Sequence, residues 1–195
     1  MKKQWWHGKT AYQIYPKSFY DSNGDGIGDI PGILSRLDYL KELGIGAVWL
    51  CPVYDSPNAD MGYDIRDYGK IMAEFGTMED FDRFMAACEE RDIHVLIDLV
   101  INHTSSKHPW FTQAVSYLQG LGDGEPSAED CPYIDYYNFA KEKKAGSWYQ
   151  VPGTDWYYEA PFWSEMPDLN LADEKVRAEI ADITQFWLDK GVAGF

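Results

Sequence analysis

The run IGAVWLCPVY, residues 45–54, is apolar along almost its whole length. A strand with one face in water alternates apolar and polar residues, whereas a strand buried on both faces of a parallel sheet is apolar throughout. Its length, and its place directly after a glycine, suit a strand better than a helix. The run therefore predicts a strand in the interior of a parallel sheet.

Helices and further strands alternate with this run along the chain. Residues 11–19 predict a strand, and apolar residues at helical spacing over 30–43 predict a helix with Pro31 in its first turn. A second helix starts at Thr77, which pairs with Asp80 in a capping-box pattern, and residues 94–103 form the next strand. Strands and helices in this order imply a parallel sheet, either a barrel or a doubly wound sheet.

The segment 104–172 interrupts this alternation with short aromatic stretches separated by glycine and proline. It is too long for an ordinary loop and too aromatic for a disordered linker, so it predicts an inserted subdomain. A helix then opens at Asp173 with an apolar stripe of Val176, Ile180, Ile183 and Trp187. GVAGF, residues 191–195, is the expected start of a fourth strand.

Charge and composition exclude several classes of protein. The 195 residues include 32 acidic and 17 basic side chains, and a net charge of -15 repels a nucleic-acid backbone. No apolar run is long enough to span a membrane, and residues 1–16 lack the apolar centre of a signal peptide. Cysteines are 3 in number, without metal-type spacing. We expect a cytoplasmic protein with reduced thiols and with neither a membrane nor a nucleic-acid partner.

The stretch DSNGDGIGD, residues 21–29, places oxygen ligands at the spacing of a calcium loop. A glycine stands at its sixth position, but Gly32 replaces the bidentate glutamate of an EF-hand. This pattern favours a structural Ca²⁺ site, which Mg²⁺ also fits. The alternative is a hydrogen-bonded turn without metal. The expected ligands are Asp21, Asn23, Asp25, the carbonyl of Ile27, and Asp29.

Polar residues gather where the predicted strands end. Asp98 and His103 lie at or after the end of an apolar strand, and Asp60 and Tyr63 lie on the loop after the preceding strand. Because the carboxyl ends of parallel strands converge, these side chains are candidates for one site. Tyr63 could stack on a sugar ring while Asp60 and His103 bind its hydroxyls. Taken one by one, the histidine is better explained as a structural histidine and each aspartate as a capping or turn residue, whereas together, at converging strand ends, they favour a site.

Several stretches together resemble the α-amylase superfamily, glycoside hydrolase family 13. The closest similarity is to the oligo-1,6-glucosidase and α-glucosidase branch, or to its intermediate group with neopullulanases. The stretches are QIYPKSFYDSNGDGIGDIPGI (13–33), LGIGAVWLCPVYDSPNADMGYDI (43–65), FGTMEDF (75–81), DLVINHTS (98–105) and MPDLN (166–170).

This resemblance implies an α/β fold, a (β/α)₈ TIM barrel with an inserted B domain after its third strand. The chain would hold an incomplete barrel, from the first strand to the start of the fourth. Residues 1–103 and 173–195 would belong to the barrel and 104–172 to the B domain. Asp60, Tyr63 and His103 would line the subsite for the sugar at the cleaved bond, and Asp98 would orient neighbouring groups. The resemblance also implies the Ca²⁺ ligands named above.

The implied activity is retaining hydrolysis of α-1,4 or α-1,6 glucosidic bonds in starch-derived malto- or isomalto-oligosaccharides. The nucleophile and the acid of this family are expected beyond Phe195, so we expect residues 1–195 alone to be inactive. The choice between the two bond types stays open. The alternative is a non-catalytic, amylase-like binding or scaffold protein.

Overall fold

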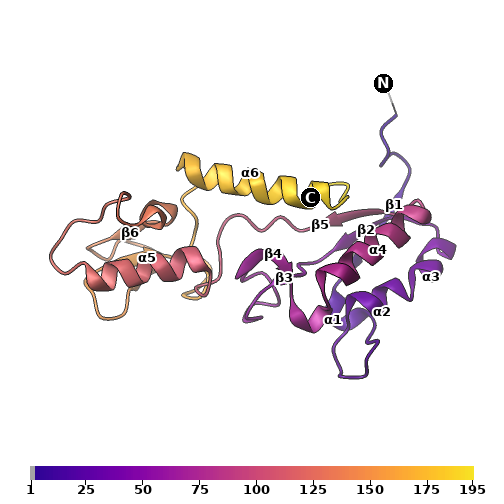
Figure 1. Cartoon of the computed structure of the whole chain (residues 1–195), viewed down its shortest axis with the longest axis horizontal. Coiled ribbons are helices and arrows are strands. Elements are labelled where there is room, and N and C mark those ends of the chain that lie inside the picture. Colours follow the sequence, from indigo (N-terminus) through magenta and orange to yellow (C-terminus); the bar gives the residue numbers. More distant parts are fainter. Residues whose placement is uncertain (1–2) are drawn as a thin grey trace. The chain divides into compact units, whose positions relative to one another are not determined.

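The computed structural model describes residues 3–195, which divide into two compact units (Figure 1). Unit 1 contains the chain up to Tyr54, Gly69–Leu99 and Thr184–Phe195, and unit 2 contains Asp55–Tyr68 and Val100–Ile183. Segment 55–68 therefore lies in the same unit as the predicted insert. The boundaries of these compact units differ from the predicted domain boundaries, 1–103, 104–172 and 173–195. The predicted boundaries follow the order of the barrel elements along the chain.

Unit 1 is built on three parallel strands, β1 (Thr10–Ile14), β2 (Ile45–Leu50) and β5 (His94–Ile97), in the order β1-β2-β5. The predicted central strand is thus paired on both edges. On the other edge of β5, Gly194 forms a parallel bridge with Leu96, and the Ala193 amide donates to the Val95 carbonyl at 2.7 Å. The predicted parallel sheet and the start of its fourth strand are confirmed.

The strands are shorter than the sequence predicts. β1 ends at Ile14, and Pro16–Phe19 forms the short helix α1. The expected strand over 15–19 is wrong because Pro16 has no amide to donate to a ladder and its fixed φ suits the first turn of a helix. β2 ends at Leu50, and β5 ends at Ile97.

The single helix expected over 30–43 is two helices, α2 (Ile30–Leu34) and α3 (Leu37–Glu42). At the break the Ser35 hydroxyl donates to the Gly32 carbonyl at 2.7 Å, and the Arg36 amide donates to Ile33 instead. A serine hydroxyl that competes for backbone groups in this way interrupts the regular helical ladder. The predicted apolar face is nevertheless buried in both pieces.

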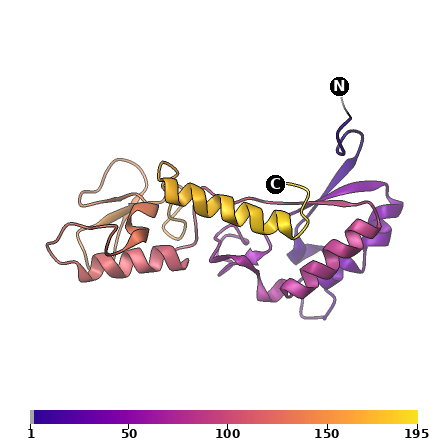
Figure 2. The same cartoon turned by 45° about the horizontal axis from the view of Figure 1, so that its top comes forward.

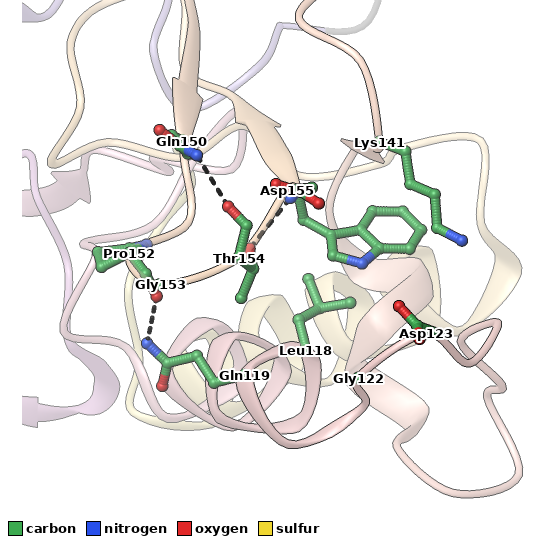
Figure 3. Close-up of a pocket in the computed structure, with 11 residues that line it drawn as sticks. Leu118, Gln119, Gly122, Asp123, Lys141, Gln150, Pro152, Gly153, Thr154 and Asp155 are labelled. Carbon is green, nitrogen blue, oxygen red and sulfur yellow. Dashed lines mark hydrogen bonds between the residues drawn. The ribbon is translucent and has the colours of Figure 1, made fainter.

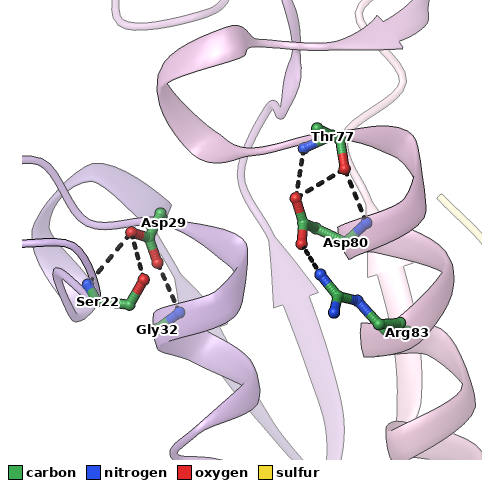
Figure 4. Close-up of polar contacts among 6 residues, drawn as sticks. All are labelled: Ser22, Asp29, Gly32, Thr77, Asp80 and Arg83. Carbon is green, nitrogen blue, oxygen red and sulfur yellow. Dashed lines mark hydrogen bonds and ion pairs between the residues drawn. The ribbon is translucent and has the colours of Figure 1, made fainter.

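Helix α4 (Met78–Glu90) begins as predicted. Thr77 Oγ1 accepts from the Asp80 amide at 3.1 Å, and the Asp80 carboxylate accepts from the Thr77 amide at 2.8 Å (Figure 4). These reciprocal bonds satisfy amides that the helix itself leaves unpaired. Phe81, Phe84 and Cys88 are fully buried on one face. Figures 1 and 2 show α2 and α4 next to each other on one side of the strands.

Unit 2 has its own core around helix α5 (Pro109–Gly120) and a three-stranded antiparallel sheet in the order β6-β8-β7. The strands are β6 (Phe139–Ala140), β7 (Trp148–Gln150) and β8 (Tyr157–Glu159), and the turn helix η2 covers Pro132–Tyr136. The predicted insert is therefore a folded subdomain rather than a loop. Its aromatic residues fill this core.

The remaining elements are β3 (Tyr54–Asp55), β4 (Asp67–Ile71), the short helix η1 (Ala73–Phe75) and α6 (Glu174–Asp189). At the start of α6, Asp173 Oδ1 accepts from the amides of Lys175 and Val176 at 2.7 and 3.2 Å, as expected for a helix cap. Among the helices described, none combines the length and the apolar character needed to cross a membrane.

Trp187 on α6 is the residue whose removal should most weaken unit 1. It is fully buried, and its ring lies 5.3 Å from that of Tyr54 and 5.1 Å from that of Phe81. We expect Trp187→Ala to cost about 3–5 kcal/mol, measured by denaturant unfolding. The neighbouring Phe186→Ala is the control, since Phe186 is 38% exposed and should cost about 1 kcal/mol or less. Equal losses in the two variants would contradict this account.

Candidate functional site

A fully buried carboxylate organises the loop that carries Asp60 and Tyr63. Asp64 is 0% exposed and accepts from the Ser56 hydroxyl at 2.9 Å and from the amides of Ala59 and Asp60 at 3.1 and 2.9 Å. A buried charge is tolerated only where donors of this kind surround it. Asp64 therefore holds the loop from within and leaves the side chain of Asp60 exposed.

The loop also contains backbone conformations that a side chain normally avoids. Asn58 and Met61 have φ angles of 60° and 55°, and Gly62 has a φ of 95°. Such angles persist where surrounding contacts impose them, as they often do at functional sites. Here the turn is closed by the Tyr63 amide, which donates to the Asp60 carbonyl at 2.9 Å.

His103 meets this loop within unit 2. Its Nε2 lies 3.2 Å from the Tyr63 carbonyl, while Nδ1 is buried and has no hydrogen-bond partner among residues 3–195. Burial lowers the pKa of His103, although the Tyr63 carbonyl and the Asp60 carboxylate act in the opposite direction. The neutral ring donates from Nε2 to the carbonyl, which leaves Nδ1 as the nitrogen with a lone pair.

Backbone contacts also fix the segment that presents His103. The Tyr68 hydroxyl donates to the carbonyls of Val100 and His103 at 2.7 and 3.2 Å, and the Ser105 amide donates to Ile65 at 2.8 Å. The structure thus brings Asp60, Tyr63 and His103 together. The contact between them is the bond from the buried His103 ring to the Tyr63 backbone, and the Asp60 side chain lies exposed on the same loop.

Asp98 belongs to unit 1 and has partners of its own. Its Oδ1 accepts from the Trp49 indole at 2.7 Å, and its carbonyl accepts from the Tyr54 hydroxyl at 2.5 Å. The indole bond orients the carboxylate at the end of β5. This geometry is compatible with the predicted orienting role, which stays a prediction.

Phe162 and Asp168 contact His103 and are further candidate site residues, which the sequence did not single out. Phe162 is 66% exposed, and its ring centroid lies 5.1 Å from that of His103. An exposed aromatic ring beside a candidate sugar site is a ready stacking surface. Its contact with His103 joins positions far apart in the chain. The only sequence signal for it was the high aromatic content of residues 104–172, which does not single out Phe162.

Asp168 is bridged to His103 through the backbone, and its Oδ1 accepts from the Asn102 amide group at 3.1 Å. Burial is the main cause that raises the pKa of Asp168 to about 6, and the nearby Glu159 carboxylate acts in the same direction. The Asn102 hydrogen bond opposes this rise. The sequence signal for this residue is the MPDLN motif, which points to the family resemblance and not to a role for Asp168.

The predicted metal loop has the oxygen atoms that a hard cation needs. Asp21 accepts from the amides of Asn23, Gly24 and Gly26 at 2.7–3.1 Å, and these amides, above all Gly26, lower its pKa. Asn23 and Asp25 each accept from an amide two residues on, at 2.9 and 2.8 Å. Successive bonds of this kind wind the loop into a series of Asx turns.

Asp29 closes the same loop and caps helix α2. Its two oxygens accept from the Gly32 amide at 2.6 Å and from the amide and hydroxyl of Ser22 at 3.2 and 2.8 Å (Figure 4). A carboxylate has about four lone-pair positions, so one is left for a cation. Within residues 3–195 no group of His, Cys, Asp and Glu side chains alone is arranged to hold a metal. An ion here would depend on the Asn23 amide and the Ile27 carbonyl as well.

Comparison with known proteins identifies relatives of the whole chain. The family model described as the α-amylase catalytic domain matches residues 13–195. Oligo-1,6-glucosidase from Bacillus cereus is 47% identical over 207 residues, which cover 100% of this chain and 35% of that protein. Glucan 1,6-alpha-glucosidase from Streptococcus pneumoniae serotype 4 is 47% identical over 202 residues, with 100% of this chain and 36% of that protein covered. The chain spans about a third of the length of these curated relatives.

Solved structures of similar proteins superpose on almost the whole chain. Eubacterium rectale Amy13B superposes with a TM-score of 0.92 at 50% identity, over 95% of this chain and 36% of that one. The isomaltulose synthase SmuA from Protaminobacter rubrum gives 0.90 at 46% identity, over 100% and 35%. The predicted fold class, an incomplete (β/α)₈ barrel with an insert after the third strand, is confirmed by these matches.

The raised pKa of Asp168 predicts a pH-dependent stability. The unfolded chain ionises this group near pH 3.8, whereas the folded chain keeps the proton up to about pH 6. The contribution of Asp168 to stability is therefore present below about pH 4 and is lost as the pH rises to about 6. We expect the stability of Asp168→Asn, relative to the parent, to increase across this window. Denaturant midpoints at a series of pH values measure this.

The exposed Asp182, also in unit 2, provides the matched control through Asp182→Asn. A stability difference between Asp168→Asn and the parent that stays constant from pH 4 to 7 would rule out the raised pKa.

Proposed function

The chain belongs to the α-amylase family, and from this we propose that the whole protein is a retaining glycosidase that cleaves α-glucosidic bonds in short oligosaccharides. We place its preference at α-1,6 bonds, because the curated relatives named above are a glucosidase of oligo-1,6 type and a glucan 1,6-alpha-glucosidase. Retaining hydrolysis needs a carboxylate nucleophile and a carboxylic acid. We assign neither role to a residue of this chain.

The observation that carries this proposal is the convergence of Asp60, Tyr63 and His103 in unit 2. The exposed Asp60 carboxylate accepts hydrogen bonds from hydroxyls of the sugar, and the Tyr63 ring supplies an apolar face for stacking. The buried, neutral His103 fixes the Tyr63 backbone through its Nε2 contact. In this role the three residues hold the glucosyl unit at the bond that is cleaved, and Asp98 orients neighbouring groups.

The same proposal includes a structural Ca²⁺ in the loop 21–29, held by Asp21, Asn23, Asp25, the Ile27 carbonyl and Asp29. The hydrogen bonds that wind the loop support it, as does the all-oxygen ligand set. Mg²⁺ is the alternative ion. The ion would stabilise the loop before α2 and would take no part in bond cleavage.

We further propose a cytoplasmic location. Cys51, Cys88 and Cys131 are all buried free thiols, which suits a reducing compartment. The proposed partners are malto- or isomalto-oligosaccharides.

Activity of the full-length protein on isomaltose, maltose and soluble starch, measured side by side, tests the function. We expect kcat/KM to be highest on isomaltose. Asp60→Asn should lower kcat/KM by roughly tenfold to a hundredfold, since a hydrogen bond to a charged group is worth about 1.5–3 kcal/mol. Asp182→Asn should leave it unchanged. Absence of hydrolysis on every α-glucoside would refute the enzyme and leave a non-catalytic binding or scaffold protein.

Removal of divalent cations tests the metal proposal. We expect a chelator to lower the thermal unfolding midpoint of the full-length protein and added Ca²⁺ to restore it, because an ion that binds only the folded state stabilises it. Asp25→Asn should weaken this response. An unfolding midpoint that does not respond to chelator or to Ca²⁺ would show that the loop is a metal-free turn.

A further inference from the structure

Unit 2 contains a cavity of about 610 Å³ that shares no residue with the Asp60–Tyr63–His103 site. It lies between the C-terminal end of α5 and the hairpin turn that joins β7 to β8 (Figure 3). Gln119 and Asp123 line it on the α5 side, and Thr154 and Asp155 line it on the hairpin side.

Hydrogen bonds hold both walls of this cavity in place. The Gln119 Nε2 group donates to the Pro152 carbonyl at 2.9 Å and so ties α5 to the hairpin. Gln150 Nε2 donates to the Thr154 carbonyl at 2.8 Å, and Thr154 Oγ1 accepts from the Trp156 amide at 3.0 Å. Trp156 and Leu118 belong to the unit 2 core. The cavity is therefore preformed, which lowers the entropic cost of binding a ligand.

Its lining is rich in hydrogen-bond acceptors. The carboxylates of Asp123 and Asp155 have neither a hydrogen bond nor an ion pair within the described chain, residues 3–195. Both glutamines bind the walls through their amide nitrogens, and their carbonyl oxygens accept no bond from these partners. Acceptors of this kind suit a ligand that carries many hydroxyl donors.

The charges of the lining exclude other ligand classes. The cavity lining contains two carboxylates, those of Asp123 and Asp155, and one ammonium group, that of Lys141. Lys141 is itself paired with Glu125 at 2.7 Å. A phosphorylated or otherwise anionic ligand is repelled. An organic cation would compete with Lys141, whose Nζ already lies 5.4 Å from the Trp156 ring centroid. A neutral polyhydroxyl compound is not repelled by the carboxylates and does not need a place over the Trp156 ring.

We propose that this cavity is a second saccharide-binding site, which takes a short neutral glucan. Its hydroxyls donate to Asp123 and Asp155 at the mouth of the cavity, beside the largely buried Trp156. The choice of a glucan rests on the proposed function. The site itself rests on the cavity and its chemistry.

Hydrogen–deuterium exchange on the full-length protein tests the proposal, with maltotriose and isomaltotriose as probes. If the protein hydrolyses them, a saturating competitive inhibitor keeps them intact and also occupies the cleavage site. We expect slower exchange in peptides that cover the end of α5 and the β7–β8 turn. Asp155→Asn should weaken binding there by roughly tenfold, because a charge-assisted hydrogen bond is lost. Asp182→Asn, remote from the cavity lining, should leave it unchanged.

The other outcomes overturn the proposal. No protection of these peptides by either trisaccharide excludes a saccharide site, and protection by spermidine in their place would identify an organic-cation site. Loss of protection in Asp182→Asn as well as in Asp155→Asn would show a non-specific charge effect. Protection without hydrolysis would refute the proposed function and leave this site standing, while hydrolysis without protection would do the reverse.

Discussion

Backbone pairing along both edges of β2 is the interaction on which unit 1 depends. Val48 pairs with Tyr12 of β1 on one side and with Val95 of β5 on the other. A strand paired on both edges lies inside the sheet, and Ile45, Val48 and Leu50 of β2 are at most 5% exposed, whereas Trp49 is 41% exposed. Parallel strands also need a crossover between them, so the helices α2, α3 and α4 follow from this pairing. The ends of these strands in turn supply the loops that carry the candidate site.

Much of this fold could be predicted because local sequence patterns indicate where its strands and helices lie. The apolar run 45–54 marked the central strand, and the Thr77–Asp80 capping box marked the start of α4. The failures arose where one local group outweighed the periodicity. Pro16 turned a predicted strand into helix, and the Ser35 hydroxyl divided a predicted helix in two. The elements within 104–172 escaped prediction because short strands and turns give no long periodic signal.

The candidate site divides in a similar way. Asp60, Tyr63 and His103 stood out as polar residues at the ends of apolar strands, and the structure brings them together. Phe162 reaches His103 from another part of the chain, and the pKa of Asp168 depends on its burial and on Glu159. Contacts of this kind depend on tertiary packing, which the spacing of residues along the chain does not encode.

The buried Asp64 fixes the shape of its loop, while other residues of the loop supply the side chains at its surface. Within the described chain, the Ser56 hydroxyl and the main-chain amides of Ala59 and Asp60 donate to this carboxylate. Exchange of the exposed Asp60 side chain should therefore leave these donors to Asp64 in place. During evolution or in protein engineering, such a loop can acquire a new ligand preference without loss of stability, as long as Asp64 itself is kept.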